Sequence, residues 1–191
     1  MAAAEPLPEA VARRPRRADA RRNYETLVAA AREVFAQQGA GGSLEEIARR
    51  AQVGIGTLYR HFPTRRDLLE AVYVDEVDAL CRAAGDLAGL PPWDALVAWL
   101  HRFVEYVATK RALAEGLADS AVFANCRTAI YAEGEPMLRR AQEAGAARPE
   151  ATFDDVLRLL TGITAASFTE PGQREKVLGF ALDGLRAPRD H

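Results

Sequence analysis

The stretch from Ser43 to Leu69 reads SLEEIARRAQVGIGTLYRHFPTRRDLL, and the rest of the chain is organised around it. Ser43 and Glu46 have the spacing of a capping box, in which each side chain accepts a backbone N–H at a helix start. A helix is therefore expected from Leu44. Its apolar positions are Leu44, Ile47, Ala48 and Ala51. Their spacing of three and four residues predicts one buried face.

A second short helix is expected from Ile55 to Phe62. Gly54 precedes it and can adopt backbone angles that a side chain would resist, so we expect the chain to turn there. Leu58 and Phe62 can face inward, and Pro63 ends the helix. The outer positions are Gly56, Thr57, Arg60 and His61. Two short helices of this kind are typical of a helix-turn-helix whose second helix enters the major groove of DNA.

The run VGIGTLYRHF, Val53 to Phe62, followed by PTRRDLL, closely resembles the DNA-binding domain of the tetracycline-repressor (TetR) family. The resemblance is specific from about Asn23 to Val72, and beyond that only the layout is similar. It implies that Ile55, Gly56 and Thr57 read bases. It also implies that Tyr59 and His61 contact the sugar-phosphate backbone and that Arg65 binds a phosphate.

The chemistry of these side chains agrees with the implied roles. Ile and Thr methyl groups can pack against the methyl of thymine, and Tyr, His and Arg can donate to phosphate oxygens. Ile55 stands where the family usually has a polar or basic residue, and Glu45 where some members have Arg. His61 could instead be a structural imidazole. The predicted DNA contacts are Ser43, Ile55, Gly56, Thr57, Tyr59, Arg60, His61, Arg65, Arg16, Arg17, Arg21 and Arg22.

Charge is distributed unevenly along the chain. Residues 1–66 hold 12 Arg and 7 acidic residues, whereas residues 67–191 hold 13 Lys or Arg and 20 acidic residues. A basic half that coincides with the helix-turn-helix suggests an end that meets a polyanion. Residues 1–18 are expected to be a disordered basic arm that lies along phosphates or in the minor groove. A solubilising tail is the alternative.

Two further helices are expected to complete the DNA-binding half. The first follows Asp19, a plausible N-cap, and ends at Gly39. Thr64 and Asp67 repeat the capping-box spacing and open a long helix. In the TetR family this helix connects the DNA-binding head to the body and its rotation transmits a ligand signal. The expected segments are an arm at 1–18, a DNA-binding domain at 19–66, a connecting helix and loop at 67–90, and a ligand-binding and dimerisation domain at 91–191.

The second half of the chain has features of a ligand-binding domain. The helix expected from Trp93 to Thr109 is apolar over a wide arc, and a short helix is expected at 112–117. Gly134 and Pro136 predict a kink or break in a longer helix from Val122 to Ala144, which would leave space for a ligand. The predicted ligand-binding residues are Trp99, Phe103, Tyr106, Phe123, Tyr131 and Met137. A central core helix is the competing interpretation.

Two closing helices are expected to form half of a four-helix bundle between two subunits. Thr152 and Asp155 have the capping-box spacing at the start of the first. The predicted dimer-interface residues are Phe153, Leu157, Leu160, Val177, Leu178 and Leu182. Internal packing is the alternative.

The sequence favours an all-α fold of about nine helices without enzymatic activity. No catalytic set, phosphate loop, metal motif or cofactor motif is recognised, and the two Cys fit a reducing compartment. No stretch is long enough to span a bilayer, so a cytoplasmic protein without a membrane partner is expected.

We therefore predict a homodimeric regulator, most simply a repressor, that releases a palindromic double-stranded DNA operator when an apolar or aromatic small molecule binds. An architectural DNA-binding protein without an effector and an enzyme with an incidental helix-turn-helix are the alternatives.

Overall fold

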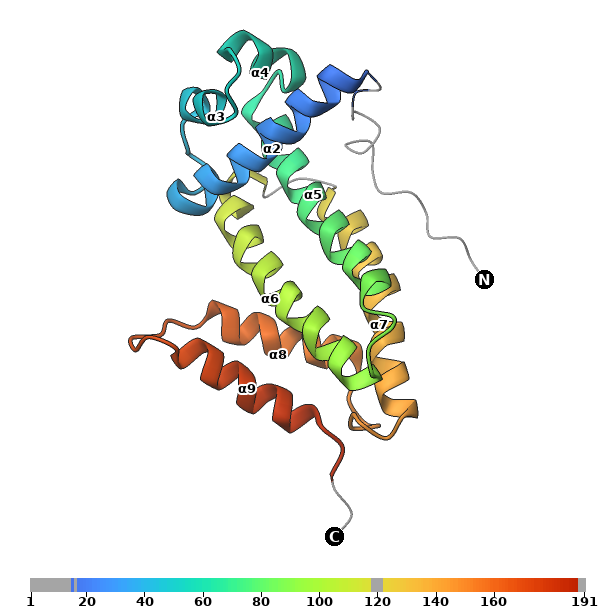
Figure 1. Ribbon diagram of the computed structural model, residues 1–191. Helices are drawn as coiled ribbons and strands as arrows, with labels where there is room; N and C mark the ends of the chain where they lie inside the picture. The colour runs from blue at the N-terminus through green and yellow to red at the C-terminus, as the bar shows by residue number, and fades with distance from the viewer. Residues whose placement is uncertain (1–14, 16, 118–121, 189–191) are drawn as a thin grey trace. The chain divides into compact units, whose positions relative to one another are not determined.

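The computed structural model describes residues 15, 17–117 and 122–188 (Figure 1). This part of the chain contains eight α-helices, and its β-structure is limited to one bridge between Ala147 and Arg186. The helices are α2 (Ala18–Gln38), α3 (Leu44–Arg50), α4 (Ile55–His61), α5 (Arg65–Asp86), α6 (Pro92–Leu117), α7 (Val122–Glu143), α8 (Phe153–Ala165) and α9 (Gln173–Leu185). The predicted all-α class is confirmed. The separate helix expected at 112–117 is the end of α6, so two predicted helices are one.

The chain divides into two compact units. The first comprises Met1–Ala79 and Thr109–Ala129, and the second comprises Leu80–Ala108 and Ile130–His191. Helices α5, α6 and α7 each contribute residues to both units. The boundaries predicted from the sequence at 18, 66 and 90 stay a prediction. None of the helices in the described ranges is both long and apolar enough to cross a membrane.

Capping boxes start two of the helices as predicted. At α5 the Thr64 N–H donates to Asp67 Oδ2 at 2.9 Å, and the Asp67 N–H donates to Thr64 Oγ1 at 3.1 Å. At α8 the same pair of bonds joins Thr152 and Asp155, at 3.2 Å each. Each box satisfies two backbone donors that have no partner within the helix.

Two predicted helix starts need correction. Ser43 caps α3 by accepting the Glu46 N–H at 3.2 Å, but the return bond is absent because the Glu46 carboxylate binds Arg49 and Arg50. The Ser43 N–H donates to Gln38 Oε1 instead, at 3.3 Å. Helix α2 begins after Arg17 without a side-chain cap, and the predicted N-cap residue Asp19 lies within the first turn.

The turn of the helix-turn-helix is made at Gln52 and not at Gly54. Gln52 has φ of 57°, whereas Gly54 has φ of −70°, which any residue can adopt. The Gln52 N–H donates to Arg49 O, and the Val53 N–H donates to Ala48 O. These are the two bonds of a Schellman motif, in which the residue after the helix end is left-handed. The expectation for Gly54 was wrong because this helix end requires the positive φ two residues earlier.

The first unit packs α2 against α3 and α3 against α4. Its core includes Leu27, Val34, Phe35, Ile47, Leu58, Phe62 and Leu68, each at most 3% exposed. Gly42 precedes α3 where a Cβ would lie 2.8 Å from Val34 Cγ1. Arg32 of α2 forms ion pairs with Asp75, at 2.7 Å, and with Glu76, both on α5. Helix α2 is thereby fixed to the middle of α5.

The second unit is organised around the buried ring of Trp99. Its Nε1 donates to Leu80 O at 3.0 Å, and its ring lies 5.8 Å from the ring of Phe153. A Cβ at Gly134 would lie 2.6 Å from Trp99 Cη2 and 2.3 Å from Phe153 Cζ, so glycine leaves room for both rings. Helix α7 is continuous through Gly134 and Pro136, so the predicted break is absent, whereas a kink there stays a prediction.

Candidate nucleic-acid interface

Helix α4 buries one side and exposes the other. Leu58 is 1% exposed, whereas Ile55 is 38% and Tyr59 is 46% exposed. Gly56 and Arg60 are also exposed, and Thr57 is half-buried. Ile55 and Tyr59 are four residues apart, so their side chains lie on the same face of the helix. Two large apolar groups on the surface of a short helix are the kind of feature that marks a contact surface.

Arg60 makes two hydrogen bonds to its own helix. Its Nη2 donates to Thr57 Oγ1 at 3.0 Å, and its Nε donates to the Gly56 carbonyl oxygen at 3.2 Å. These three residues thus share the outer side of α4 with Ile55 and Tyr59. The predicted base-reading positions therefore lie on the same side of the helix as Tyr59, whereas His61 does not.

His61 is half-buried at the end of α4. Its ring lies edge-on to Tyr24 with centroids 6.3 Å apart, and its centroid is 6.2 Å from that of Phe62. Burial lowers the pKa of His61, and the charge of Arg60 lowers it further. His61 is therefore predominantly neutral at neutral pH. The ring packing agrees with the structural alternative, and a neutral imidazole still has one N–H that can donate to a phosphate.

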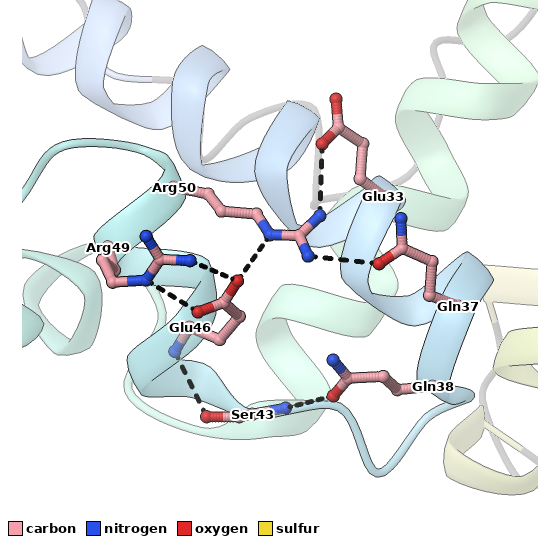
Figure 2. A network of polar contacts seen from close by, with 7 residues as sticks. All are labelled: Glu33, Gln37, Gln38, Ser43, Glu46, Arg49 and Arg50. Carbon is pink, nitrogen blue, oxygen red and sulfur yellow. Dashed lines mark hydrogen bonds and ion pairs between the residues drawn. The ribbon is translucent and has the colours of Figure 1, made fainter.

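A polar network joins α3 to α2 (Figure 2). Arg50 donates to Glu46 Oε1 at 2.7 Å and to Gln37 Oε1 at 3.1 Å, and it forms an ion pair with Glu33 at 3.5 Å. Arg49 binds both carboxylate oxygens of Glu46, at 2.7 and 2.8 Å. Glu46 therefore links two arginines of α3, and Arg50 extends the link to α2.

This network predicts a specific acid dependence of stability. Hydrogen bonds from Arg49, and to a smaller extent from Arg50, lower the pKa of Glu46 from 4.5 to about 2. A folded-state pKa below the unfolded value stabilises the protein above about pH 4.5, and this contribution is lost as the pH falls toward 2. Glu46→Gln should therefore lower the melting temperature more at pH 6 than at pH 2.5. Thermal melts recorded at several pH values between these two measure the difference. Glu45→Gln is the control. An equal fall in the melting temperature of Glu46→Gln at both pH values would contradict the stabilising role of the ionised Glu46.

Arg65 is hydrogen-bonded to the loop between α2 and α3. Its Nη1 donates to Ala40 O at 3.2 Å and to Gly42 O. Arg65 is the first residue of α5 and is half-buried, so the loop is held against the start of this helix. The phosphate contact implied by the resemblance stays a prediction. Sequence reasoning missed the contact with the loop because the partners are 23 and 25 residues away.

Removal of the Arg65 guanidinium should destabilise the first unit. In Arg65→Met the carbonyls of Ala40 and Gly42 lose a charged donor, which typically costs about 1–3 kcal/mol of unfolding free energy. Urea unfolding measures this change. Arg66→Met is the matched control because Arg66 is exposed and paired only with Glu70 in the described structure, so its change should stay within about 0.5 kcal/mol. Equal stability of the two variants would show that Arg65 does not hold the loop.

The basic residues near the N-terminus are partly described. Arg17, Arg21 and Arg22 are exposed, and Arg16 and the rest of the predicted arm except residues 15, 17 and 18 lie outside the described residues. Arg22 pairs with Asp19 at 2.7 Å and Arg21 with Glu25 at 3.8 Å. Exposed pairs of this kind are weak, so phosphates can replace the carboxylates at low cost.

The residues predicted to bind a ligand are gathered mainly in the second unit. Trp99, Phe103, Tyr106 and Met137 are buried and Tyr131 is half-buried, whereas the side chain of Phe123 lies outside the described residues. The ring centroids of Trp99 and Phe103 are 6.0 Å apart, and those of Phe103 and Tyr106 are 5.8 Å apart. Tyr131 donates to Asp154 Oδ1 at 2.5 Å. The aromatic cluster exists, and its role in ligand binding stays a prediction.

The predicted dimer-interface residues lie mainly inside one protomer. Helix α8 packs against α9, and the buried residues are Phe153, Leu157, Leu160, Leu178 and Leu182, with Val177 half-buried. Leu159 of α8 and Phe180 of α9 are instead 43% and 63% exposed. Sequence reasoning missed both because they lie off the main apolar stripe. A large apolar residue outside the stripe of its helix was the signal in the sequence that could have found them.

Comparison with known proteins agrees with this geometry. Residues 27–72 match the model of the bacterial regulatory proteins of the tetR family, and residues 91–187 match that of the C-terminal domain of SbtR-like transcriptional regulators. The TetR transcriptional regulator SCO0520 from Streptomyces coelicolor is 38% identical, with a TM-score of 0.77 over 87% of this chain and 99% of that chain. This chain belongs to the TetR family. It is a transcriptional regulator with a helix-turn-helix DNA-binding domain and not an enzyme.

Two further comparisons differ in extent. A TetR regulator from Mycobacterium vanbaalenii is 33% identical, with a TM-score of 0.73 over 91% of this chain and all of that one. The TetC protein of transposon Tn10 from Escherichia coli is 32% identical over 88 residues, which is 44% of either chain. The chain therefore spans less than half the length of this curated relative.

Proposed function

We propose that a homodimer of this TetR regulator represses transcription from a palindromic operator and releases it when a small molecule binds the second unit. The observation that carries the DNA-binding part is the outer side of α4, where Ile55, Thr57, Tyr59 and Arg60 accompany an exposed Gly56. A helix of this kind fits the major groove, where methyl groups and hydroxyls contact base edges and Tyr and Arg contact phosphates.

Selection from a pool of random-sequence duplexes tests this function. A specific regulator should enrich one palindrome whose half-sites lie roughly 34–36 Å apart, or a multiple of that distance, as two recognition helices related by a two-fold axis require. A footprint on genomic DNA should then cover few sites. General binding without an enriched motif would contradict the proposal and favour an architectural protein.

Gly56→Ala should separate folding from DNA binding. In the described part of the chain, no atom beyond the adjacent residues and the backbone of α4 lies within 4 Å of a Cβ placed at Gly56. Alanine therefore fits and should stabilise the helix by about 0.5–1 kcal/mol. The added methyl group would stand between α4 and the base edges and should weaken operator binding about tenfold or more. Thermal melts and fluorescence anisotropy measure the two effects.

Gly85→Ala provides the matched control for that substitution. Gly85 lies in α5, and a Cβ there likewise meets no described atom within 4 Å apart from its neighbours in the same helix. The control should gain similar stability and keep its operator affinity. Unchanged operator affinity of Gly56→Ala would remove α4 from close contact with DNA.

The aromatic cluster of α6 and α7 supports the ligand part of the proposal. Ligand sites are mostly apolar with a few placed polar groups, which suits Phe103, Tyr106 and Met137 beside Tyr131. Helices α5, α6 and α7 contribute to both units, so a ligand that changes their packing in one unit can affect the other. A ligand shifts an equilibrium only through its different affinities for the two states.

A panel of aromatic and lipophilic compounds tests the ligand part. An inducer should both raise the melting temperature of the DNA-free protein and release the operator. Phe103→Ala should abolish both responses. Leu100→Ala on the same helix is the control: it should lower stability, because Leu100 is wholly buried, and keep both responses, because Leu100 is not among the predicted ligand-binding residues. No response to the panel, together with a purely structural effect of Phe103→Ala, would leave the cluster as core.

A further inference from the structure

The hydrogen bond between Arg60 and Thr57 determines what Thr57 can offer to a bound molecule. A guanidinium group only donates, so Thr57 Oγ1 is the acceptor in the 3.0 Å bond. The second bond, from Arg60 Nε to the Gly56 carbonyl, fixes the guanidinium at two points on α4. Arg60 and Thr57 are therefore joined on the outer side of this helix, and we call them the Arg60–Thr57 pair.

The hydroxyl hydrogen of Thr57 has no acceptor among residues 15, 17–117 and 122–188. One lone pair of the oxygen is taken by Arg60, and the adjacent positive charge polarises the O–H bond. Hydrogen bonds that involve a charged partner strengthen their neighbours in a chain of bonds. Thr57 is consequently a strengthened donor toward a molecule that approaches α4.

We propose that Arg60 is a positioning residue that makes Thr57 a hydrogen-bond donor in base recognition. In the major groove the acceptors are N7 and O6 of guanine, N7 of adenine and O4 of thymine, and the donors are the amino groups of cytosine and adenine. We therefore expect the base opposite Thr57 to present an acceptor. An amino group there is disfavoured, because Oγ1 already accepts from the cationic Arg60 and its remaining lone pair is a weaker acceptor. This inference rests on the proposed function and adds the polarity of one base contact to it.

A direct reading of guanine by Arg60 is the competing role. Arginine commonly donates two bonds to O6 and N7 of guanine, and in that role Arg60 would release Thr57 on binding. Arg60 and Thr57 would then specify two different base pairs. In the positioning role, by contrast, both side chains act on the same base pair.

The test compares variants of the full chain on duplexes selected by the wild-type protein. Thr57→Val keeps the shape of the side chain and removes the hydroxyl, Thr57→Ser keeps the hydroxyl, and Arg60→Met removes the donors to Thr57. The double variant combines Thr57→Val with Arg60→Met. Anisotropy titrations measure each protein against the selected duplex and all its single base-pair changes at one salt concentration. Arg66→Met controls for the loss of one positive charge.

The discrimination between the selected base pair and its alternatives is the decisive quantity, because a uniform loss of phosphate contacts cancels in this ratio. Thr57→Val should reduce discrimination by about 5- to 100-fold at one base pair. Arg60→Met should reduce it at the same base pair, the double variant should lose little more, and Thr57→Ser should retain it. Replacement of the selected purine by its 7-deaza form should reproduce the loss if N7 is the acceptor.

Other outcomes separate this inference from the proposed function. If the wild-type protein selects no common sequence, the proposed function fails. If a palindrome is selected but Thr57→Val and Arg60→Met affect different base pairs, or their effects on one base pair multiply independently, the positioning role is overturned while the function stands. Selection of an amino group opposite Thr57 would likewise overturn it.

Discussion

Gly134→Ala should lower the free energy of unfolding by about 1–3 kcal/mol, although alanine is normally the better residue in a helix. The added Cβ would lie 2.3 Å from Phe153 Cζ and 2.6 Å from Trp99 Cη2. Neither ring can retreat easily. Trp99 is wholly buried and bonded to Leu80 O, and Phe153 is also packed against the ring of Tyr131 at 5.3 Å. The rings or α7 must shift, and such overpacking outweighs the gain in helix propensity.

Urea unfolding at a fixed temperature measures this loss, with Gly85→Ala as the control in an open position of α5. The control should be stabilised by up to about 1 kcal/mol. Phe153→Leu combined with Gly134→Ala should recover part of the loss relative to the two single variants, because the smaller side chain makes room for the methyl group. A stabilised Gly134→Ala protein would show that the rings do not need the glycine.

The example of Gly134 shows why local sequence patterns predicted only part of the fold. Glycine and proline two residues apart predicted a kink or break, because their propensities are properties of the backbone, and the helix is not broken. Here the glycine serves contacts with Trp99 and Phe153, which come from helices distant in sequence. Gln52 is a similar case, since its positive φ follows from the hydrogen bonds that end α3. The capping boxes of α5 and α8 were predictable because all their atoms lie within four residues.

The candidate nucleic-acid interface was likewise predictable only in part from the sequence. Periodicity placed Leu58 inside and Gly56, Thr57 and Arg60 outside, because these residues belong to one helix of regular geometry. It also placed His61 outside, which was wrong, because the His61 ring packs against Tyr24 and Phe62. The resemblance to the TetR family supplied the expected roles. It did not reveal that Arg65 donates to the loop before α3, or that Arg60 donates to Thr57. Such contacts depend on side-chain geometry that spacing alone does not determine.

Arginine at both Leu159 and Phe180 should convert the proposed dimer into a folded monomer with at least about 100-fold weaker operator binding. The two side chains are the exposed large apolar groups of α8 and α9 in the described structure, so their replacement leaves the protomer core intact. In a dimer formed through α8 and α9, as predicted from the sequence, each arginine would instead be buried without a partner, which is strongly unfavourable. Loss of the second subunit removes bivalent binding to the two half-sites, which typically contributes 10²- to 10⁴-fold.

Light scattering measures the oligomeric state, circular dichroism the fold, and anisotropy the operator affinity. Leu90→Arg is the matched control, because Leu90 is as exposed as Leu159, at 43%, and precedes α6 outside the proposed interface. Leu160→Arg cannot serve the same purpose, since Leu160 is wholly buried in the protomer and its replacement would unfold α8 and α9 whether or not they form an interface. A folded double variant that remains dimeric would place the interface elsewhere. A monomeric variant with unchanged operator affinity would instead show that one protomer suffices for DNA binding.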